Sequence, residues 1–218
     1  MPTYNITEIN EILKEDNIFV PAEIVLFTLI KNSKTEEIKG GLSPLSERRY
    51  RVSREDILLT GKEIYKKGYV LCESKELSSG TYLPKIDDIF ERFIEMSQIE
   101  ITLLAPYLST EFIADLGRKF SDKKSITKII TNAPNSSISL PKQRQVIESL
   151  KRKGIKVITG KVDLHAKVYI FDNKAAILCS SNLSRKGFFS LYELGVAIFG
   201  QDVTTLKQLA DNLAETAN

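Results

Sequence analysis

The chain has 218 residues, of which 42% are hydrophobic and 27% are charged, and its formal net charge is +3. This composition is typical of a folded protein of one or two domains and excludes a chain that is mainly disordered. The longest apolar stretch, residues 18–30, is too short for a membrane span, and the N-terminus has no basic start followed by an apolar run. We therefore expect a cytoplasmic protein with no signal peptide and no membrane partner.

The first 85 residues have a mainly helical pattern. Helices are predicted over 7–15 with Thr7 as the cap, over 21–31, and from Ser53 to a stop at Gly68. Residues 69–73 and 80–83 are predicted to form a two-stranded hairpin. Helices followed by a hairpin suggest a winged helix that binds nucleic acid, whereas the alternative is a small helical domain with a solvated basic face. The candidate phosphate contacts around the third helix are Arg49, Arg51, Arg54 and Lys62.

After residue 85, helical and strand patterns alternate. Helices are predicted over 86–98, 110–120, 141–153 and 203–214, and strands over 99–105, 126–131, 155–159, 166–171, 175–179 and 194–199. Strands separated by helices indicate an α/β sandwich with a mostly buried sheet. Because the pattern changes at residues 78–84, we predict one domain over 1–85 and a second over 86–218.

Polar residues gather around the only histidine of the chain, His165. His165 and Lys167 are two residues apart, as are Ser180 and Asn182, so each pair shares one face of an extended strand. A hairpin that turns at residues 172–174 brings the two pairs together. The two cysteines, Cys72 and Cys179, form neither a disulfide framework nor a zinc motif.

This set of side chains suits a phosphodiester. The imidazole can attack phosphorus, and the Lys167 ammonium can contact a non-bridging oxygen. The Ser180 hydroxyl and the Asn182 amide can donate hydrogen bonds to charge that grows in the transition state. Glu193 can accept a hydrogen bond from the second imidazole nitrogen and so fix the tautomer.

At these residues the chain resembles the phospholipase D superfamily, in its branch with one motif per chain. The family signature is His-x-Lys-x(4)-Asp, then Gly-Ser-x-Asn, then a downstream Glu. The matching residues here are His165, Lys167, Asp172, Ser180, Asn182 and Glu193. The resemblance covers residues 86–218 and implies a phospholipase D-like α/β sandwich with a central mixed sheet.

The resemblance also implies a mechanism. One histidine forms a covalent phosphohistidine, a second histidine protonates the leaving oxygen, and no metal or other cofactor takes part. Members with one motif dimerise so that each subunit supplies one histidine, and most of them are nucleases. This chain departs from the pattern at Cys179, where the family has glycine, and at Leu191, where members often have asparagine. Asp172 lies at the predicted turn, so we expect its role to be mainly structural.

A basic run precedes the histidine and bears on the substrate. Its candidate nucleic-acid contacts are Lys142, Arg144, Lys151, Arg152 and Lys156. The run leads into the strand before His165, so it predicts a basic track toward the site. Phe188 and Phe189 could stack on bases, and the sequence shows no clear exposed apolar lip of the kind that a lipid enzyme needs.

These observations predict a homodimeric, metal-independent endonuclease that hydrolyses DNA or RNA. One alternative is a lipid phosphodiesterase or phosphatidyl transferase. The other is a non-catalytic winged-helix regulator whose phospholipase D-like domain binds a ligand or dimerises.

Overall fold

The structure is a computed structural model that describes residues 1–39, 48–74, 83–109, 112, 126–133, 143–160, 163–184, 186–187 and 191–215. In chain order the elements are β1 (Thr3–Tyr4), α1 (Ile6–Glu15), α2 (Ala22–Lys31), β2 (Glu36–Lys39), β3 (Arg49–Arg51), α3 (Arg54–Lys67), β4 (Tyr69–Glu73), α4 (Ile86–Met96), β5 (Glu100–Leu104), β6 (Ile126–Asn132), α6 (Gln143–Arg152), β7 (Lys156–Gly160), β8 (Val168–Phe171), β9 (Ala175–Cys179), β10 (Leu194–Phe199) and α8 (Gln201–Glu215). The predicted helix over 110–120 lies outside the described residues except for Phe112.

Local capping determines where the first and third helices begin. The Asn5 side chain accepts a hydrogen bond from the Glu8 N–H, and the Glu8 carboxylate accepts one from the Asn5 N–H. The prediction of Thr7 as the cap is therefore wrong, because this reciprocal capping box starts α1 at Ile6. The prediction for α3 is confirmed: Ser53 caps its start, and Gly68 ends it in the left-handed conformation with φ of 85°.

The second strand of the predicted hairpin of residues 69–73 with 80–83 lies outside the described residues except for Leu83, so this pairing stays a prediction. β4 pairs antiparallel with β10, from Tyr69 opposite Ile198 to Glu73 opposite Leu194. β4 satisfies backbone groups of β10 that would otherwise be unpaired at a sheet edge. A strand from the first third of the chain thus completes the large sheet, and the winged helix and the division at residue 85 stay predictions.

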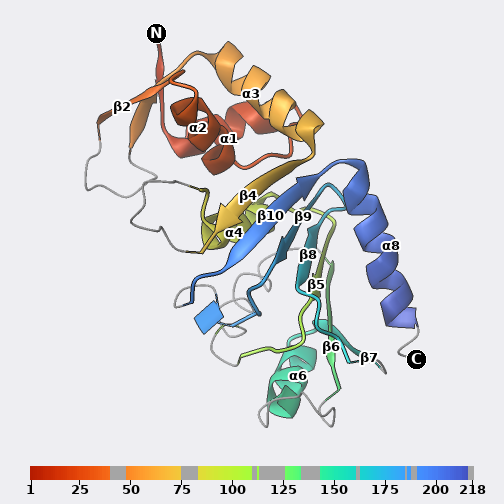
Figure 1. Cartoon of the computed structure of the whole chain (residues 1–218). Coiled ribbons are helices and arrows are strands. Elements are labelled where there is room, and N and C mark those ends of the chain that lie inside the picture. Colours follow the sequence, from red (N-terminus) through yellow and green to blue (C-terminus); the bar gives the residue numbers. More distant parts are fainter. Residues whose placement is uncertain are drawn as a thin grey trace.

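The large sheet has seven strands in the order β4-β10-β9-β8-β5-β6-β7. β5, β6 and β7 are parallel, and the other neighbours are antiparallel, which confirms the predicted mixed sheet. The hairpin of β8 and β9 is also confirmed, and its turn residues Asp172 and Asn173 have positive φ angles. Figure 1 shows this sheet at the centre, with α1–α3 above it and α8 beside it.

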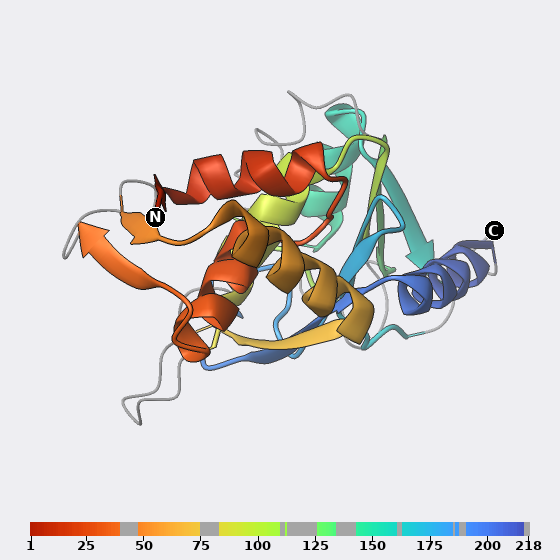
Figure 2. The same cartoon turned by 90° about the horizontal axis from the view of Figure 1, so that it is seen from above.

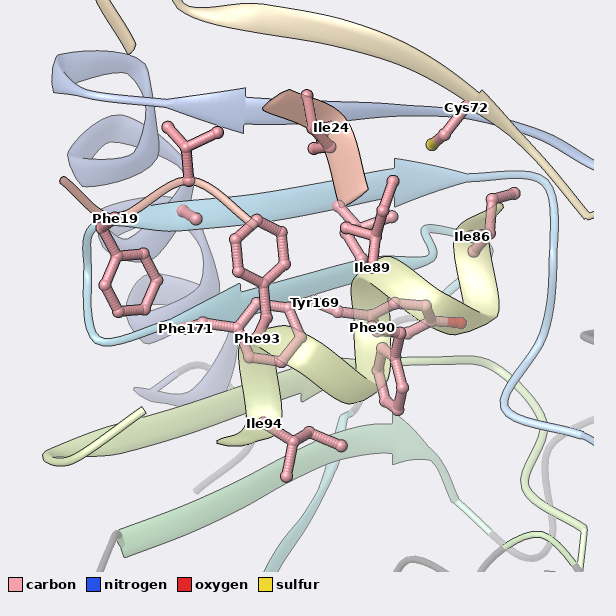
Figure 3. Packing of buried hydrophobic residues seen from close by; sticks show 14 of the residues in the cluster. Phe19, Ile24, Cys72, Ile86, Ile89, Phe90, Phe93, Ile94, Tyr169 and Phe171 are labelled. Carbon is pink, nitrogen blue, oxygen red and sulfur yellow. The ribbon is translucent and has the colours of Figure 1, made fainter. Parts of the chain in front are cut away.

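Helices cover both faces of this sheet, and the core on one face continues into the N-terminal helices. On that face, the Phe93 ring of α4 stacks on Phe171 with centroids 5.1 Å apart, and Phe90 meets Tyr169 edge to face at 5.3 Å. Phe19, from the segment between α1 and α2, stacks on the same Phe93 at 5.9 Å (Figure 3). The N-terminal helices therefore share one hydrophobic core with α4 and the sheet.

The opposite face of the sheet is covered by α8, whose Val203, Ala210 and Ala214 pack in a second core cluster. Seen from above, α8 lies apart from the N-terminal helices (Figure 2). Within the described ranges, the structure contains no helix with the length and apolar character needed to cross a membrane.

Candidate active site

The predicted catalytic residues lie at one end of the seven-stranded sheet. The register places Leu104 of β5 opposite Val168, Val168 opposite Leu178, and Leu194 opposite Glu73. His165 and Lys167 come just before β8, Ser180 and Asn182 just after β9, and Glu193 just before β10. The alternation of strand direction therefore brings three separate segments to the same end of the sheet, which we call the site end.

His165 and Lys167 lie on an extended segment beside the end of β9. The Lys167 carbonyl accepts a hydrogen bond of 3.2 Å from the Cys179 N–H, and the Lys167 ammonium donates one of 3.2 Å to the His165 carbonyl. The His165 side chain is exposed. The only imidazole of the chain is thus accessible to a substrate, and the Lys167 ammonium is hydrogen-bonded to the backbone of the same residue.

Ser180 and Glu193 form a pair at the site end. The Ser180 hydroxyl donates a short hydrogen bond to the Glu193 carboxylate, and the Ser180 N–H donates one of 3.0 Å to the Leu194 carbonyl. Among the described residues, no hydrogen bond joins the Glu193 carboxylate to His165. The structure therefore places Glu193 at the predicted site, with Ser180 as its present partner.

The Asn182 carboxamide has one oxygen atom, Oδ1, that is buried without a hydrogen-bond partner among the described residues. The backbone around it is well held, since the Tyr169 hydroxyl donates 2.7 Å to the Ser181 carbonyl and the Ser184 N–H donates 2.7 Å to the Asn182 carbonyl. Buried polar atoms without partners are uncommon and occur at functional positions.

Asp172, the last residue of the His-Lys-Asp motif, lies at the opposite end of the sheet. Its carboxylate accepts hydrogen bonds from the backbone N–H groups of Gln98, Ile99 and Glu100, at 2.6, 2.8 and 2.9 Å. The residue is only 7% exposed. These contacts join the β8–β9 turn to the start of β5 and support a structural role.

Cys179 occupies the position at which the family that this chain resembles has glycine. A glycine on the neighbouring strand leaves room for its side chain. Gly195 lies directly opposite Cys179, and a Cβ atom added to Gly195 would be 3.0 Å from the Cys179 Cβ. Burial raises the pKa of the Cys179 thiol to about 11 and that of Cys72 to about 12. Both thiols therefore stay protonated at neutral pH and serve as packing groups.

Two buried polar residues hold the backbone next to predicted catalytic residues. Neither was predicted from the sequence. The Asn132 side chain hydrogen-bonds both backbone groups of Leu164, which precedes His165. The Ser74 hydroxyl accepts a hydrogen bond of 2.8 Å from the Glu193 N–H, and the Ser74 N–H donates one of 3.0 Å to the Glu193 carbonyl. Neither residue belongs to a recognisable motif, so only the tertiary contacts identify them.

The four basic residues predicted around α3 are all in ion pairs. Arg49 pairs with Glu8 at 3.2 Å, Arg51 with Glu36 at 2.6 Å, Arg54 with Glu15 at 2.8 Å and Lys62 with Asp16 at 4.0 Å. Each pairing offsets a positive charge that could attract phosphate. Binding of nucleic acid by this surface stays a prediction, with a weaker local field than the residue count suggests.

The basic residues of α6 and β7 are exposed, but most of them lie away from His165. α6 begins at the site end, where the buried Gln143 amide contacts Pro106 and Thr131. Lys156 lies at the opposite end, because the site end of β7 is at Gly160. The exposed side chains are Arg144, Lys151, Arg152 and Lys156. Lys142, Phe188 and Phe189 lie outside the described residues.

Exposed apolar side chains form a surface on β4 and β10 that reaches the site end at Leu194 and the opposite end of the sheet at Tyr69. Tyr69 and Leu71 of β4 and Leu194 of β10 are each about half exposed, at 49%, 53% and 53%. Leu191 and Tyr192, just before Glu193, are exposed as well. A shallow hollow of about 390 Å³ lies on this surface. The sequence did not reveal it because β4 comes from a distant segment.

The groups available for chemistry at the site end are one imidazole, one ammonium, one carboxamide and a hydroxyl–carboxylate pair. They can supply a nucleophile, bind phosphoryl oxygens and accept a proton. In the part of the chain that the structure describes, no three His, Cys, Asp or Glu side chains come together in a way that could hold a metal ion.

Comparison with known proteins identifies similar folds. The family model described as "Cardiolipin synthase, PLD-like domain" matches residues 90–216. Nuc, a phospholipase D family member from Salmonella typhimurium, is 14% identical, with a TM-score of 0.54 over 69% of this chain and 95% of Nuc. NucT from Helicobacter pylori is 17% identical, with a TM-score of 0.49 over 58% of this chain and 85% of NucT.

The archaeal chromatin protein TrmBL2 is 15% identical, with a TM-score of 0.45 over 99% of this chain and 88% of TrmBL2. No curated protein sequence matches the chain. The similarity to Nuc confirms the predicted sandwich fold.

Proposed function

Because the chain belongs to the phospholipase D-like family, we propose that it is a phosphodiesterase that hydrolyses DNA or RNA as a metal-independent endonuclease. The observation that carries the proposal is the meeting of His165, Lys167, Ser180, Asn182 and Glu193 at one end of the sheet, with the imidazole exposed. The chain has one histidine, so the proposal includes a homodimer whose two copies share one site.

In the proposed reaction, the imidazole of His165 attacks phosphorus, a P–N bond forms, and the P–O bond to the leaving group breaks. The partner subunit's His165 donates a proton to the leaving oxygen. The same imidazole then removes a proton from water, which attacks phosphorus and breaks the P–N bond. Lys167, Ser180 and Asn182 bind the phosphoryl oxygens, and Glu193 accepts a hydrogen bond from an imidazole in the shared site.

The charge distribution supports nucleic acid as the substrate. The exposed basic side chains of α6 are Arg144, toward the site end, and Lys151 and Arg152, at the other end of the helix, with the exposed acid Glu148 between them. A polyanion longer than the site itself can contact both ends of the helix, whereas a small phosphodiester cannot. Binding should therefore weaken steeply as the salt concentration rises.

A lipid phosphodiester is the second candidate substrate, because Leu194, at the site end of the apolar surface on β4 and β10, directly follows Glu193 of the Ser180–Glu193 pair. Acyl chains could cover such a surface while the headgroup phosphate reaches the site. A regulator without catalysis is the third candidate, and the experiment below distinguishes all three.

The test is incubation of the full chain with labelled single-stranded and double-stranded DNA and RNA, and in parallel with phosphatidylcholine vesicles, all in EDTA. We expect nucleic-acid cleavage that EDTA leaves nearly unchanged, and a covalent adduct of the protein with the labelled substrate that survives quenching in alkaline denaturant and is lost in acid, because a P–N bond to histidine is labile in acid. Cleavage that EDTA abolishes and magnesium restores would contradict the mechanism. Turnover of the lipid alone supports the second candidate, and DNA binding without cleavage supports the third.

Asn182→Ala is expected to lower kcat on nucleic acid by about 10²–10³-fold, because one preorganised donor to the phosphoryl oxygens is lost. Steady-state kinetics measure the effect, and circular dichroism checks the fold. Asn32→Ala, at the exposed end of α2, is the matched control and should keep wild-type activity. Wild-type kcat in Asn182→Ala would remove this residue from the site.

A further inference from the structure

Asn132 is fully buried at the end of β6, and its side chain is hydrogen-bonded to a single residue of the segment before β8. Its amide nitrogen donates a hydrogen bond of 3.0 Å to the Leu164 carbonyl, and its Oδ1 accepts one of 2.6 Å from the Leu164 N–H. β8 begins only at Val168, so no strand ladder supports the backbone at Leu164. One side chain therefore satisfies both backbone groups of the residue that precedes His165.

The residues around the end of β6, where Asn132 lies, are also buried and hydrogen-bonded. The Thr131 hydroxyl donates 3.3 Å to the Pro106 carbonyl, and the Gln143 amide donates 2.9 Å to the Thr131 hydroxyl and 3.1 Å to Pro106. All these side chains are less than 1% exposed. These contacts hold the backbone at the end of β6, where Asn132 follows Thr131 in the strand.

We propose that Asn132 is the positioning residue of His165: its two hydrogen bonds to Leu164 hold the backbone from which the nucleophilic imidazole projects. The role of the imidazole rests on the proposed function, whereas the two hydrogen bonds do not. His165 is exposed, so where its ring lies depends on the position of its backbone as well as on contacts made in the shared site.

The two hydrogen bonds to Leu164 need a side chain that has both a donor and an acceptor, as asparagine has. A backbone N–H and a backbone C=O of one residue need an acceptor and a donor side by side, which a carboxamide supplies. In Asn132→Asp an ionised carboxylate turns its second oxygen toward the Leu164 carbonyl, and the two oxygens repel each other; a protonated carboxyl would keep both bonds, so the comparison is made on the alkaline side of neutral pH. The variant keeps the size and shape of the side chain, so the change is confined to one hydrogen bond and one charge.

The test uses His165 as its own probe, because it is the only histidine and its imidazole NMR signals need no assignment. We expect Asn132→Asp to shift or broaden these signals and to lower kcat by roughly 10–100-fold with little change in KM, as supporting residues of reactive groups do. Asn132→Ser is the second variant, since its shorter side chain places the hydroxyl too far from Leu164 to replace both bonds of the carboxamide; an effect in the same direction is expected.

Ser97→Ala is the matched control. Ser97 is 4% exposed, and its hydroxyl donates 2.7 Å to the Phe93 carbonyl, remote from the site end. It should lose stability in urea unfolding but keep the wild-type imidazole signals and kcat. Unchanged imidazole signals in folded Asn132→Asp and Asn132→Ser would overturn the positioning role. If the wild-type chain hydrolyses no phosphodiester, the proposed function fails, while the NMR comparison still decides whether Asn132 positions His165.

Discussion

His165→Asn is expected to abolish hydrolysis, with a loss on the order of 10⁴-fold or more in kcat. Asparagine keeps a polar side chain at the exposed position but cannot form the phosphoryl–imidazole bond or transfer the proton. The trapped covalent adduct should disappear with the activity. Single-turnover assays measure the first effect, and quenching in alkaline denaturant, which preserves the P–N bond, measures the second. A variant that still cleaves at a rate near the wild type would exclude the imidazole as nucleophile.

A mixed dimer tests whether two copies share the site. Wild-type and His165→Asn chains, carrying different tags without histidine, can be coexpressed and the mixed dimer isolated. In a shared site both imidazoles are needed, so the mixed dimer should be nearly as inactive as the variant homodimer. Independent sites would instead leave about half of the activity in the mixed dimer. A wild-type chain that is monomeric and active also contradicts the shared site.

Asp172→Ala is expected to lower the free energy of unfolding by about 3 kcal/mol, which for a chain of this size lowers Tm by roughly 6–12 °C. The carboxylate accepts hydrogen bonds from Gln98, Ile99 and Glu100, and its removal leaves these N–H groups without their charged acceptor. Urea and thermal unfolding measure the loss. At temperatures well below Tm the variant should retain most of its kcat, because the site end is at the other end of the sheet.

Asn173→Ala separates the hydrogen bonds of Asp172 from backbone strain. Asn173 has a φ of 53°, nearly the same as the 52° of Asp172, but its side chain is exposed and is not hydrogen-bonded within the described residues. Alanine there should cost only about 1 kcal/mol, the strain of a left-handed non-glycine residue. Equal losses in the two variants would show that strain rather than the three bonds explains the effect, and an Asp172→Ala variant that is stable but inactive would return Asp172 to the site.

Local pattern was sufficient where neighbouring residues decide the structure. The cap at Ser53, the stop at Gly68 and the turn at Asp172–Asn173 follow from side-chain or φ preferences within a few residues. The same reading missed the cap at Asn5, because Thr7 is equally suited to the role and only the reciprocal bonds with Glu8 distinguish them. For β4, the strand itself was predicted correctly, whereas its pairing with β10 was not predicted.

The partner of β4 is decided by contacts between residues more than a hundred positions apart. The same long-range contacts create the apolar surface at Leu71 and Leu194 and place Ser74 against Glu193. Likewise, the ion pairs of Arg49, Arg51 and Arg54 depend on acids from other elements, so a count of basic residues overstated the positive field of that surface.

The sequence by itself determined the alternation of helices and strands after residue 85 and the chemical identity of the candidate site, because hydrophobic period and residue spacing are local properties. Only the tertiary structure decided which groups support that site. Asn132 and Ser74 act through backbone groups of Leu164 and Glu193, and any residue type offers the same N–H and C=O. Such contacts leave no pattern in the amino-acid sequence, since they depend on where the strands end in space.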